Sequence, residues 1–504
     1  MKPLSRGQNF LSLFLAGALF PLALAPFSLW PVATISIAIL FWQLQHQTMT
    51  QAFTKASFFG FGLFIAGVSW VYVSIHEYGF MPAPLALIAT VLFCLFLALL
   101  FAAPFSLSAL IPQTLTGWIS GLPAIWVLSE WTRTWIFTGF PWLFAGYAHT
   151  ETWLNGWAPI GGVLWLSLIC ALSGAILAQF AQGKIIQRPI AMATVALLVL
   201  GASGQALQYK TWTVASGQQL AVVLVQPNID QFEKWRPGSL PAILAQLNEQ
   251  TAAHWGADLI IWPEAAIPAV PRRVKDFLAD THSKAEAAKT TLLTGIPTYD
   301  PKQRQYHNSM LALGNNEGAT QYHKTRLVPF GEYVPMESLL RGLITFFDLP
   351  MSAFSFGPDN QRPFTVQGEN ISAAICYEVV YPDLVARITR ESSVMLTVSN
   401  DTWFGRSLAP EQHMQMAQMR ALENAKPMVR GTNNGISALV DHQGRIYQSI
   451  EQYSQGELVG TIDPRNGRTV FSKYGSWPTV VLIILILINC LIPSRKNKEA
   501  NNEN

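Results

Sequence analysis

The sequence of residues 371–378 is ISAAICYE, a strand-like run that ends at Cys376. The other three cysteines, Cys94, Cys170 and Cys490, lie inside long apolar segments. Cys376 alone lies in a part of the chain that has the composition of a soluble domain. In α/β folds, functional groups are presented where strands end. Cys376 is therefore a candidate nucleophile, and the alternative is a cysteine packed in the core.

The composition divides the chain into parts of different character. Of its 504 residues, 50% are hydrophobic and only 12% are charged, whereas soluble domains carry about 25% charged residues. Residues 8–208 are nearly free of charge, and residues 217–472 have an ordinary globular composition. The net charge of +3 and the absence of basic runs interleaved with aromatic residues give no sign of nucleic-acid binding. The sequence predicts one domain in a bilayer and one outside it.

Transmembrane helices need about 20 apolar residues each. The expected spans, eight in all, are residues 9–25, 28–44, 54–75, 83–107, 115–131, 160–181, 190–208 and 477–493. Pro21, Pro26 and Pro31 interrupt the first pair, which is either two spans joined by a tight turn or a re-entrant feature. Under the positive-inside rule, the flanking lysines and arginines place both chain ends in the cytoplasm.

These segments divide the chain into four expected regions. Residues 1–210 form a membrane domain of about seven helices, and residues 217–472 form a domain on the outer side of the membrane. Residues 477–493 form a last transmembrane helix, and residues 494–504 form a cytoplasmic tail. The expected protein is therefore multi-pass, with its globular domain away from the cytoplasm.

The globular region alternates between strand-like and helical patterns. Strand composition occurs at residues 220–226, 259–262, 291–294, 371–375 and 394–398, and helical periodicity at residues 238–254, 271–287 and 410–425. Residues 436–447 have the pattern of a hairpin, with a turn at Asp441–Gly444. This alternation predicts an α/β domain in which helices cover a mixed sheet.

Three short segments of this domain carry residue types that fit acyl transfer. Glu264 follows a strand and offers a carboxylate, Lys324 lies in a shaped loop, and Cys376 ends another strand. A base can remove the proton of a thiol, and a nearby ammonium lowers the pKa of that thiol. An ammonium and backbone N–H groups can also stabilise the oxyanion of an acyl-transfer intermediate. Each residue alone is as easily a core or surface residue, so the combination carries the argument.

The order of these segments resembles the nitrilase superfamily. The runs that carry the resemblance are FEKW at 232–235, WPE at 262–264, HKTRLVPFGE at 323–332, ICYE at 375–378, SNDTWFG at 399–405 and RGTNNG at 430–435. Enzymes of that superfamily have an αββα sandwich and a Glu–Lys–Cys triad. The resemblance implies that Glu264 is the general base, Lys324 the oxyanion-stabilising cation and Cys376 the nucleophile.

A nitrilase-like domain between membrane helices is similar to the apolipoprotein N-acyltransferase family, and the similarity covers nearly the whole chain. It implies a multi-span α-helical membrane domain plus an α/β nitrilase-like αββα sandwich, in the bacterial inner membrane with the catalytic domain in the periplasm. It also implies an acyltransferase of lipoprotein biosynthesis. The acyl chain would pass from a phospholipid, typically phosphatidylethanolamine, through a thioester on Cys376 to the N-terminal amine of a diacylglyceryl-cysteine apolipoprotein. No cofactor and no metal are implied.

Several residues near these motifs are candidates for further roles, with local packing or pairing as the alternative. Candidates for supporting the triad are Glu332, Tyr377 and Glu378; candidates for binding substrate are Trp235, Asn400 and Trp403; and candidates for meeting a phosphate are Arg420 and Arg430. Residues 344–351 and 354–356 form an apolar loop that has no obvious partner within the domain. This favours an arm that contacts the membrane over a hydrophobic plug inside the domain. Its candidate contact residues are Phe346, Phe347, Met351 and Phe354.

Two other functions fit parts of the sequence. A membrane-anchored nitrilase-type amidase would hydrolyse its acyl-enzyme with water, but eight spans are more than an anchor requires. A transporter or scaffold with a decayed enzyme domain would not need an intact Glu264, Lys324 and Cys376 set. The charges within the apolar segments are also too sparse for an ion path.

Overall fold

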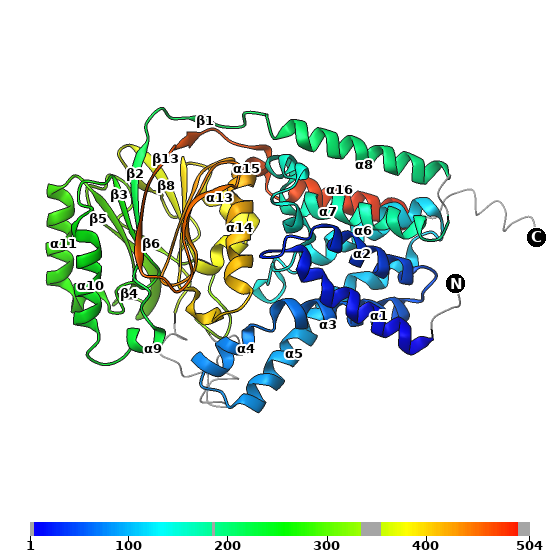
Figure 1. Cartoon of the computed structure of the whole chain (residues 1–504), viewed down its shortest axis with the longest axis horizontal. Coiled ribbons are helices and arrows are strands. Elements are labelled where there is room, and N and C mark those ends of the chain that lie inside the picture. The colour runs from blue at the N-terminus through cyan, green and yellow to red at the C-terminus, as the bar shows by residue number, and fades with distance from the viewer. Residues whose placement is uncertain (1–4, 184–186, 334–353, 492–504) are drawn as a thin grey trace, which may run out of the picture. The chain divides into compact units, whose positions relative to one another are not determined.

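The computed structural model describes residues 5–183, 187–333 and 354–491 (Figure 1). The chain divides into two compact units. The helical unit comprises Met1–Tyr72, Pro84–Lys210 and Ser476–Asn504, and the sandwich unit comprises Val73–Ala83 and Thr211–Gly475. The sandwich unit therefore includes a short segment, Val73–Ala83, that the sequence pattern had assigned to the membrane domain.

The helical unit has a helix at each position where the apolar pattern predicted one. These helices are α1 (Arg6–Leu19), α2 (Pro31–Leu44), α3 (Met49–Val68), α5 (Ala83–Ala102), α6 (Leu115–Thr132), α7 (Ala158–Phe180), α8 (Arg188–Leu207) and α16 (Trp477–Leu491). Glycines let α1 and α3 pack closely, because a Cβ atom on Gly17 would collide with the carbonyl oxygen of Phe59. A Cβ atom on Gly62 would likewise collide with the carbonyl oxygen of Phe14. Small residues at helix contacts are a common feature of helices that pack in lipid.

Four helical segments among the described residues are long and apolar enough to cross a membrane: Met49–Val68, Ala83–Leu110, Trp153–Phe180 and Arg188–Leu207. Shorter apolar helices lie at Gly7–Ala23, Pro31–Leu44 and Trp477–Cys490. The helix α2, for example, has only 14 residues, fewer than the ~20 that span a bilayer core. The helical membrane domain is thus confirmed in character, and the total of eight spans stays a prediction.

The sandwich unit is built around two six-stranded sheets. The first sheet has the order β13 (Gly456–Ile462), β2 (Leu220–Gln226), β3 (Leu259–Trp262), β4 (Thr291–Asp300), β5 (Gln305–Gly314) and β6 (Gln321–His323). The second sheet has the order β12 (Ile446–Ile450), β11 (Ser437–Val440), β10 (Met428–Thr432), β9 (Val394–Ser399), β8 (Glu369–Ile375) and β7 (Phe364–Val366). Strands β2, β3 and β4 run parallel, as do β8, β9 and β10, and antiparallel strands flank both groups.

Apolar side chains from both sheets form one shared core. Leu224 and Ile261 of the first sheet belong to the same buried cluster as Leu396 and Val429 of the second. The other face of the first sheet is covered by α10 (Leu240–Ala252) and α11 (Lys275–Ala287), and α13 (Pro382–Ile388) and α14 (Ala409–Asn424) contact the second sheet. Figure 1 shows the resulting order of helix, sheet, sheet and helix. The αββα sandwich is therefore confirmed, as is the hairpin of β11 and β12.

Candidate active site

Each residue of the expected triad lies just beyond the end of a strand. Glu264 follows β3 by two residues, Lys324 directly follows β6, and Cys376 directly follows β8. Their exposed fractions are 7%, 1% and 8%. Cys376, at the turn that follows β8, is therefore buried rather than exposed. Burial strengthens the electrostatic interactions among the three groups.

Two of these turns require an unusual backbone conformation. Cys376 itself has a φ of +52°, and Ala265, next to Glu264, has a φ of +46°. Residues other than glycine rarely adopt this left-handed conformation, and they do so mainly where the surrounding structure holds them. The strand β8 therefore turns sharply at Cys376 into the 3₁₀ helix η9 (Cys376–Val380).

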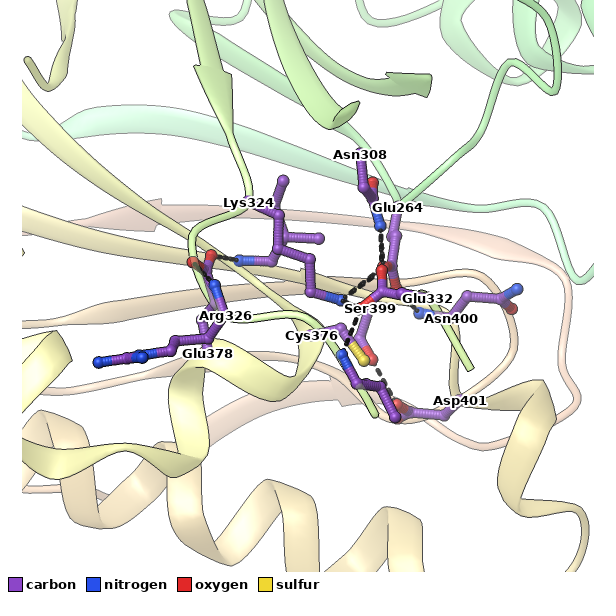
Figure 2. Close-up of polar contacts among 12 residues, drawn as sticks. Glu264, Asn308, Lys324, Arg326, Glu332, Cys376, Glu378, Ser399, Asn400 and Asp401 are labelled. Atoms are coloured by element: carbon purple, nitrogen blue, oxygen red, sulfur yellow. Dashed lines mark hydrogen bonds and ion pairs between the residues drawn. The ribbon is translucent and has the colours of Figure 1, made fainter. Parts of the chain in front are cut away.

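Lys324 lies between two carboxylates (Figure 2). Its Nζ atom is 3.4 Å from Oε1 of Glu264 and 2.9 Å from the carboxylate of Glu332. Glu332 also accepts a 2.8 Å hydrogen bond from the N–H of Val328, which fixes the carboxylate within its own loop. The structure thus brings Glu264, Lys324 and Glu332 together as the sequence predicted, and it places Glu332 as a partner of the lysine.

The electrostatics of the cluster favour an ammonium and a protonated thiol at rest. Burial alone would lower the pKa of Lys324, but the carboxylates of Glu332 and Glu264 raise it above its usual value. Burial raises the pKa of the Cys376 thiol, and Glu264 raises it further, whereas Lys324 opposes the rise. A thiol that stays protonated requires a base to activate it. Glu264 interacts electrostatically with both groups, so its carboxylate is a candidate for this base.

Two asparagines hold the Glu264 carboxylate in place. The Nδ2 atom of Asn308, on β5, donates to Oε1 of Glu264 at 2.8 Å and to Glu332 at 2.9 Å. The backbone N–H of Asn400 donates to Oε2 of Glu264 at 2.9 Å. The side chain of Asn400 donates to Gln231 at 2.7 Å, so this residue, expected to bind substrate, contacts Glu264 through its backbone and Gln231 through its side chain. Sequence patterns gave no signal for Asn308, which lies in an ordinary strand.

Glu378 forms hydrogen bonds both with the strand that precedes Cys376 and with the loop that follows Lys324. It accepts hydrogen bonds from the backbone N–H groups of Ile375, Thr325 and Arg326, from the Thr325 hydroxyl and from Tyr322 Oη. Burial raises the pKa of Glu378, and hydrogen bonds from Ile375 and Thr325 oppose the rise. The hydrogen bonds of Glu378 are with backbone and hydroxyl groups, so Glu378 orients the chain segments beside Cys376 and Lys324 rather than the thiol itself.

The remaining candidates near the site lie in different surroundings. Tyr377 is buried and packs edge-on against Tyr381, with 5.3 Å between ring centroids. Trp403 packs against Tyr78 of the segment Val73–Ala83 at 5.4 Å, and its carbonyl accepts a 2.6 Å hydrogen bond from Ser74 Oγ. Trp235, at the end of α9 (Gln231–Lys234), is 36% exposed.

The expected membrane arm lies mostly outside the described residues, which leaves Phe346, Phe347 and Met351 without a structural account. Phe354 is described and half-buried, and its N–H donates to the carbonyl of Glu332 at 2.9 Å. The chain beyond the arm therefore returns to a residue that contacts Lys324.

The two arginines proposed to meet a phosphate do not fit that role. Arg420 pairs with Glu423 at 2.7 Å, and Arg430 pairs with Asp401 at 2.9 Å. Both guanidinium groups are fully buried, and a buried charge requires such a partner. The described residues contain no group of three or more His, Cys, Asp or Glu side chains placed to hold a metal ion.

Comparison with known proteins identifies the families to which the two parts of the chain are similar. Residues 16–176 match the family described as the apolipoprotein N-acyltransferase N-terminal domain, and residues 202–470 match the carbon-nitrogen hydrolase family. The apolipoprotein N-acyltransferase of Pseudomonas aeruginosa PAO1 is 43% identical over 484 residues, which cover 95% of this chain and 94% of that protein. The enzyme of Pseudomonas syringae pv. tomato is 41% identical and covers 96% of both chains.

The chain belongs to the apolipoprotein N-acyltransferase family. It is therefore an acyltransferase that N-acylates lipoproteins, which confirms the function implied by the motifs. A transporter or scaffold with a decayed enzyme domain is excluded by this membership and by the complete Glu264, Lys324 and Cys376 cluster. The family also implies a lipoprotein acceptor and a phospholipid donor in a membrane.

Proposed function

We propose that the chain transfers an acyl chain from phosphatidylethanolamine, through a thioester on Cys376, to the α-amine of a diacylglyceryl-cysteine apolipoprotein. The observation that supports this proposal is the buried contact of Lys324 with Glu264, beside a thiol that interacts with both. One base, one cation and one nucleophile are the groups that acyl transfer through a covalent intermediate requires.

In the first half-reaction, the Glu264 carboxylate accepts the proton of the Cys376 thiol, and the sulfur bonds to the ester carbonyl carbon of the phospholipid. The carbonyl oxygen becomes an oxyanion, which the Lys324 ammonium stabilises. The bond from that carbon to the glycerol oxygen then breaks, and Glu264 returns its proton to the glycerol oxygen. The products are a lysophospholipid and the Cys376 thioester.

In the second half-reaction, the neutral α-amine of the lipoprotein attacks the thioester carbonyl. Glu264 accepts a proton from the attacking nitrogen, the carbon–sulfur bond breaks, and the thiolate takes the proton back. The products are an amide and the free Cys376 thiol. A thioester reacts with amines more readily than the oxygen ester from which it came, so the transfer needs no activation by a nucleoside triphosphate.

The acceptor distinguishes this proposal from an amidase. We expect purified protein, phosphatidylethanolamine in detergent micelles and a synthetic diacylglyceryl-cysteine peptide to give N-acylated peptide and lysophospholipid in equal amounts. Release of free fatty acid without N-acylated peptide would contradict the transfer and favour hydrolysis. Phosphatidylglycerol with the same acyl chains tests the headgroup, and we expect it to react more slowly.

The catalytic region, residues 217–472, is proposed to lie on the periplasmic side of the inner membrane, with residues 494–504 in the cytoplasm. Lys302 is exposed on the sandwich unit, so Lys302→Cys offers a site for a membrane-impermeant maleimide. Labelling in intact spheroplasts supports the orientation, whereas labelling only after lysis contradicts it.

Phe346, Phe347, Met351 and Phe354 are proposed to contact the membrane and help the lipid enter. Trp235 and Trp403 are proposed to contact substrate. The paired substitution Phe346→Asp and Phe347→Asp should slow acylation of Cys376 by a phospholipid in vesicles. A folded variant that is acylated at the normal rate would exclude the arm.

A further inference from the structure

A buried polar cluster lies beneath the nucleophile, outside the contacts that the proposed chemistry uses. It joins His413 on α14, Arg430 on β10 and Asp401 in η10 (Asp401–Phe404). The exposed fractions of these residues are 1%, 0% and 2%. Polar groups as deeply buried as these are costly unless they are fully paired, so the cluster needs an explanation.

His413 contacts the backbone of the nucleophile. Its Nε2 atom lies 3.3 Å from the carbonyl oxygen of Cys376, and its Nδ1 atom lies 3.0 Å from a terminal nitrogen of Arg430. A guanidinium can only donate hydrogen bonds. The Nδ1 atom also lies 3.3 Å from Oδ1 of Asp401, which can only accept, so the contacts of Nδ1 do not decide the tautomer. The Cys376 carbonyl oxygen can only accept as well, so the Nε2 atom carries a proton in its bond to that carbonyl, and in the neutral imidazole Nδ1 then accepts from Arg430.

The charges around His413 keep it neutral. Burial lowers the pKa of His413, and Arg430 lowers it further, whereas Asp401 opposes the change. Burial alone would raise the pKa of Asp401, but the ion pair with Arg430 holds it well below its usual range, and the neighbouring side chains of His413 and Ser399 act in the same direction. Asp401 and Arg430 thus hold the imidazole in place through contacts with its Nδ1 atom.

The Cys376 carbonyl is a position where such a contact matters. Cys376 adopts a left-handed φ of +52°, a conformation that a residue with a side chain leaves unless its neighbours hold it. The direction of its carbonyl is set by its backbone torsions, and the position of its sulfur is set by those torsions together with the side-chain torsion χ1. A bond to the carbonyl therefore restricts the positions that the sulfur can take relative to Glu264 and Lys324.

We infer that His413, oriented by Asp401 and Arg430, is a positioning residue that holds Cys376 in its left-handed conformation and so aims the sulfur at Lys324. His413 does not act as the base, because its Nε2 proton is already donated to a carbonyl oxygen. The inference rests on the proposed function only in that Cys376 is the nucleophile.

Alkylation of Cys376 by iodoacetamide tests this role without any lipid. The rate is followed against pH by mass spectrometry of the Cys376 peptide, which separates it from the other three cysteines. The charged groups that face the thiol, Glu264, Lys324 and Asp401, remain in every variant. Failure of the proposed acyl transfer would leave this measurement unaffected.

His413→Gln and His413→Asn form a matched pair. The glutamine amide nitrogen occupies the position of Nε2 and can reach the Cys376 carbonyl, whereas the shorter asparagine cannot. We expect His413→Gln to keep the wild-type pH profile. We expect His413→Asn and His413→Leu to shift it to higher pH and to slow alkylation at neutral pH by about tenfold, which corresponds to a pKa change of one unit.

A stability control separates positioning from folding. Met419 is buried on the same helix, so Met419→Ala should lower the melting temperature and leave the alkylation profile unchanged. Equal profiles for His413→Gln and His413→Asn would overturn the inference. A folded His413→Leu variant with the wild-type profile would overturn it as well.

Discussion

The side-chain amide of Asn308 donates a 2.8 Å hydrogen bond to the Glu264 carboxylate. The same amide donates to Glu332 at 2.9 Å, so it holds two acids beside Lys324 (Figure 2). Asn308→Asp would put a third carboxylate there, and like charges at this distance disfavour ionisation. We expect kcat to fall about 100-fold with Asn308→Asp, a loss comparable to that of a general base.

The control for this prediction is Asn315→Asp, because Asn315 is exposed at the end of the same hairpin of β4 and β5. It should leave kcat unchanged. Normal kcat in Asn308→Asp would show that the base does not depend on this amide.

The contact between Glu332 and Lys324 predicts a change in pH dependence. Glu332 raises the pKa of Lys324 against the effect of burial, so Glu332→Gln should lower that pKa. The ammonium would then lose its proton at a lower pH than in the wild type. We expect the alkaline limb of the pH profile for acylation of Cys376 to move to lower pH, and an unmoved limb would contradict the role of Lys324 as the cation.

Glu378 predicts an effect on stability. It accepts hydrogen bonds from Ile375, Thr325 and Arg326 while fully buried. In Glu378→Gln, the amide NH₂ would face at least one of these donors, and each buried group left without a bond costs about 1–3 kcal/mol. We expect the free energy of unfolding to fall by about 2–4 kcal/mol in denaturant titrations. Glu391→Gln, at an exposed position, should change it little.

Lys234 predicts a pH-dependent stability with a definite sign. Its Nζ atom is buried and donates to the carbonyl of Glu264 at 3.2 Å. Burial lowers the pKa of Lys234 from 10.5 to about 8, and Glu264 opposes the change. Between these values the unfolded chain binds more protons than the folded chain, so stability rises with pH from about 8 to 10.5.

Lys234→Met removes this titration. The free energy of unfolding of the wild type, relative to that of the variant, should therefore rise across this interval by up to about 3 kcal/mol. Equal slopes in the two proteins would show that Lys234 does not titrate there.

Glu264 and Cys376 could be placed from the sequence because each follows a recognisable strand end, whereas Lys324 was expected in a loop and the short strand β6 before it was not predicted. Glu264, Lys324 and Cys376 lie in short runs whose order along the chain is itself distinctive. The parts of the site that depend on contacts between distant segments could not be predicted in this way. Asn308 lies in a strand without a motif, and only the pairing of β5 with β4 and β6 brings it beside Glu264.

The cluster around His413 likewise could not be predicted from the sequence. The pattern of α14 contains many polar residues, which favours an exposed helix, yet His413 and its neighbours are buried. The helix can be buried because Arg430 and Asp401, 29 residues apart in sequence, form an ion pair beneath it. Pairing of charges across elements decides such burial, and sequence periodicity does not record it.

The sequence pattern places Val73–Ala83 in the membrane domain, at the end of the expected span 54–75 and in the loop before the expected span 83–107. In the structure it belongs to the sandwich unit, where Tyr78 stacks on Phe232 with 5.4 Å between ring centroids. Apolar composition predicts that a segment is buried but does not distinguish lipid from protein as its surroundings.

The central claim is that Cys376 carries the acyl chain. It is tested most directly by mass spectrometry of the Cys376 peptide from protein incubated with phosphatidylethanolamine in the absence of an acceptor. A mass increase of one fatty-acyl group on that peptide, removed by hydroxylamine and absent in Cys376→Ala, is the predicted result. N-acylation of the acceptor peptide by Cys376→Ala, or turnover without an adduct on Cys376 at any time point, would contradict it.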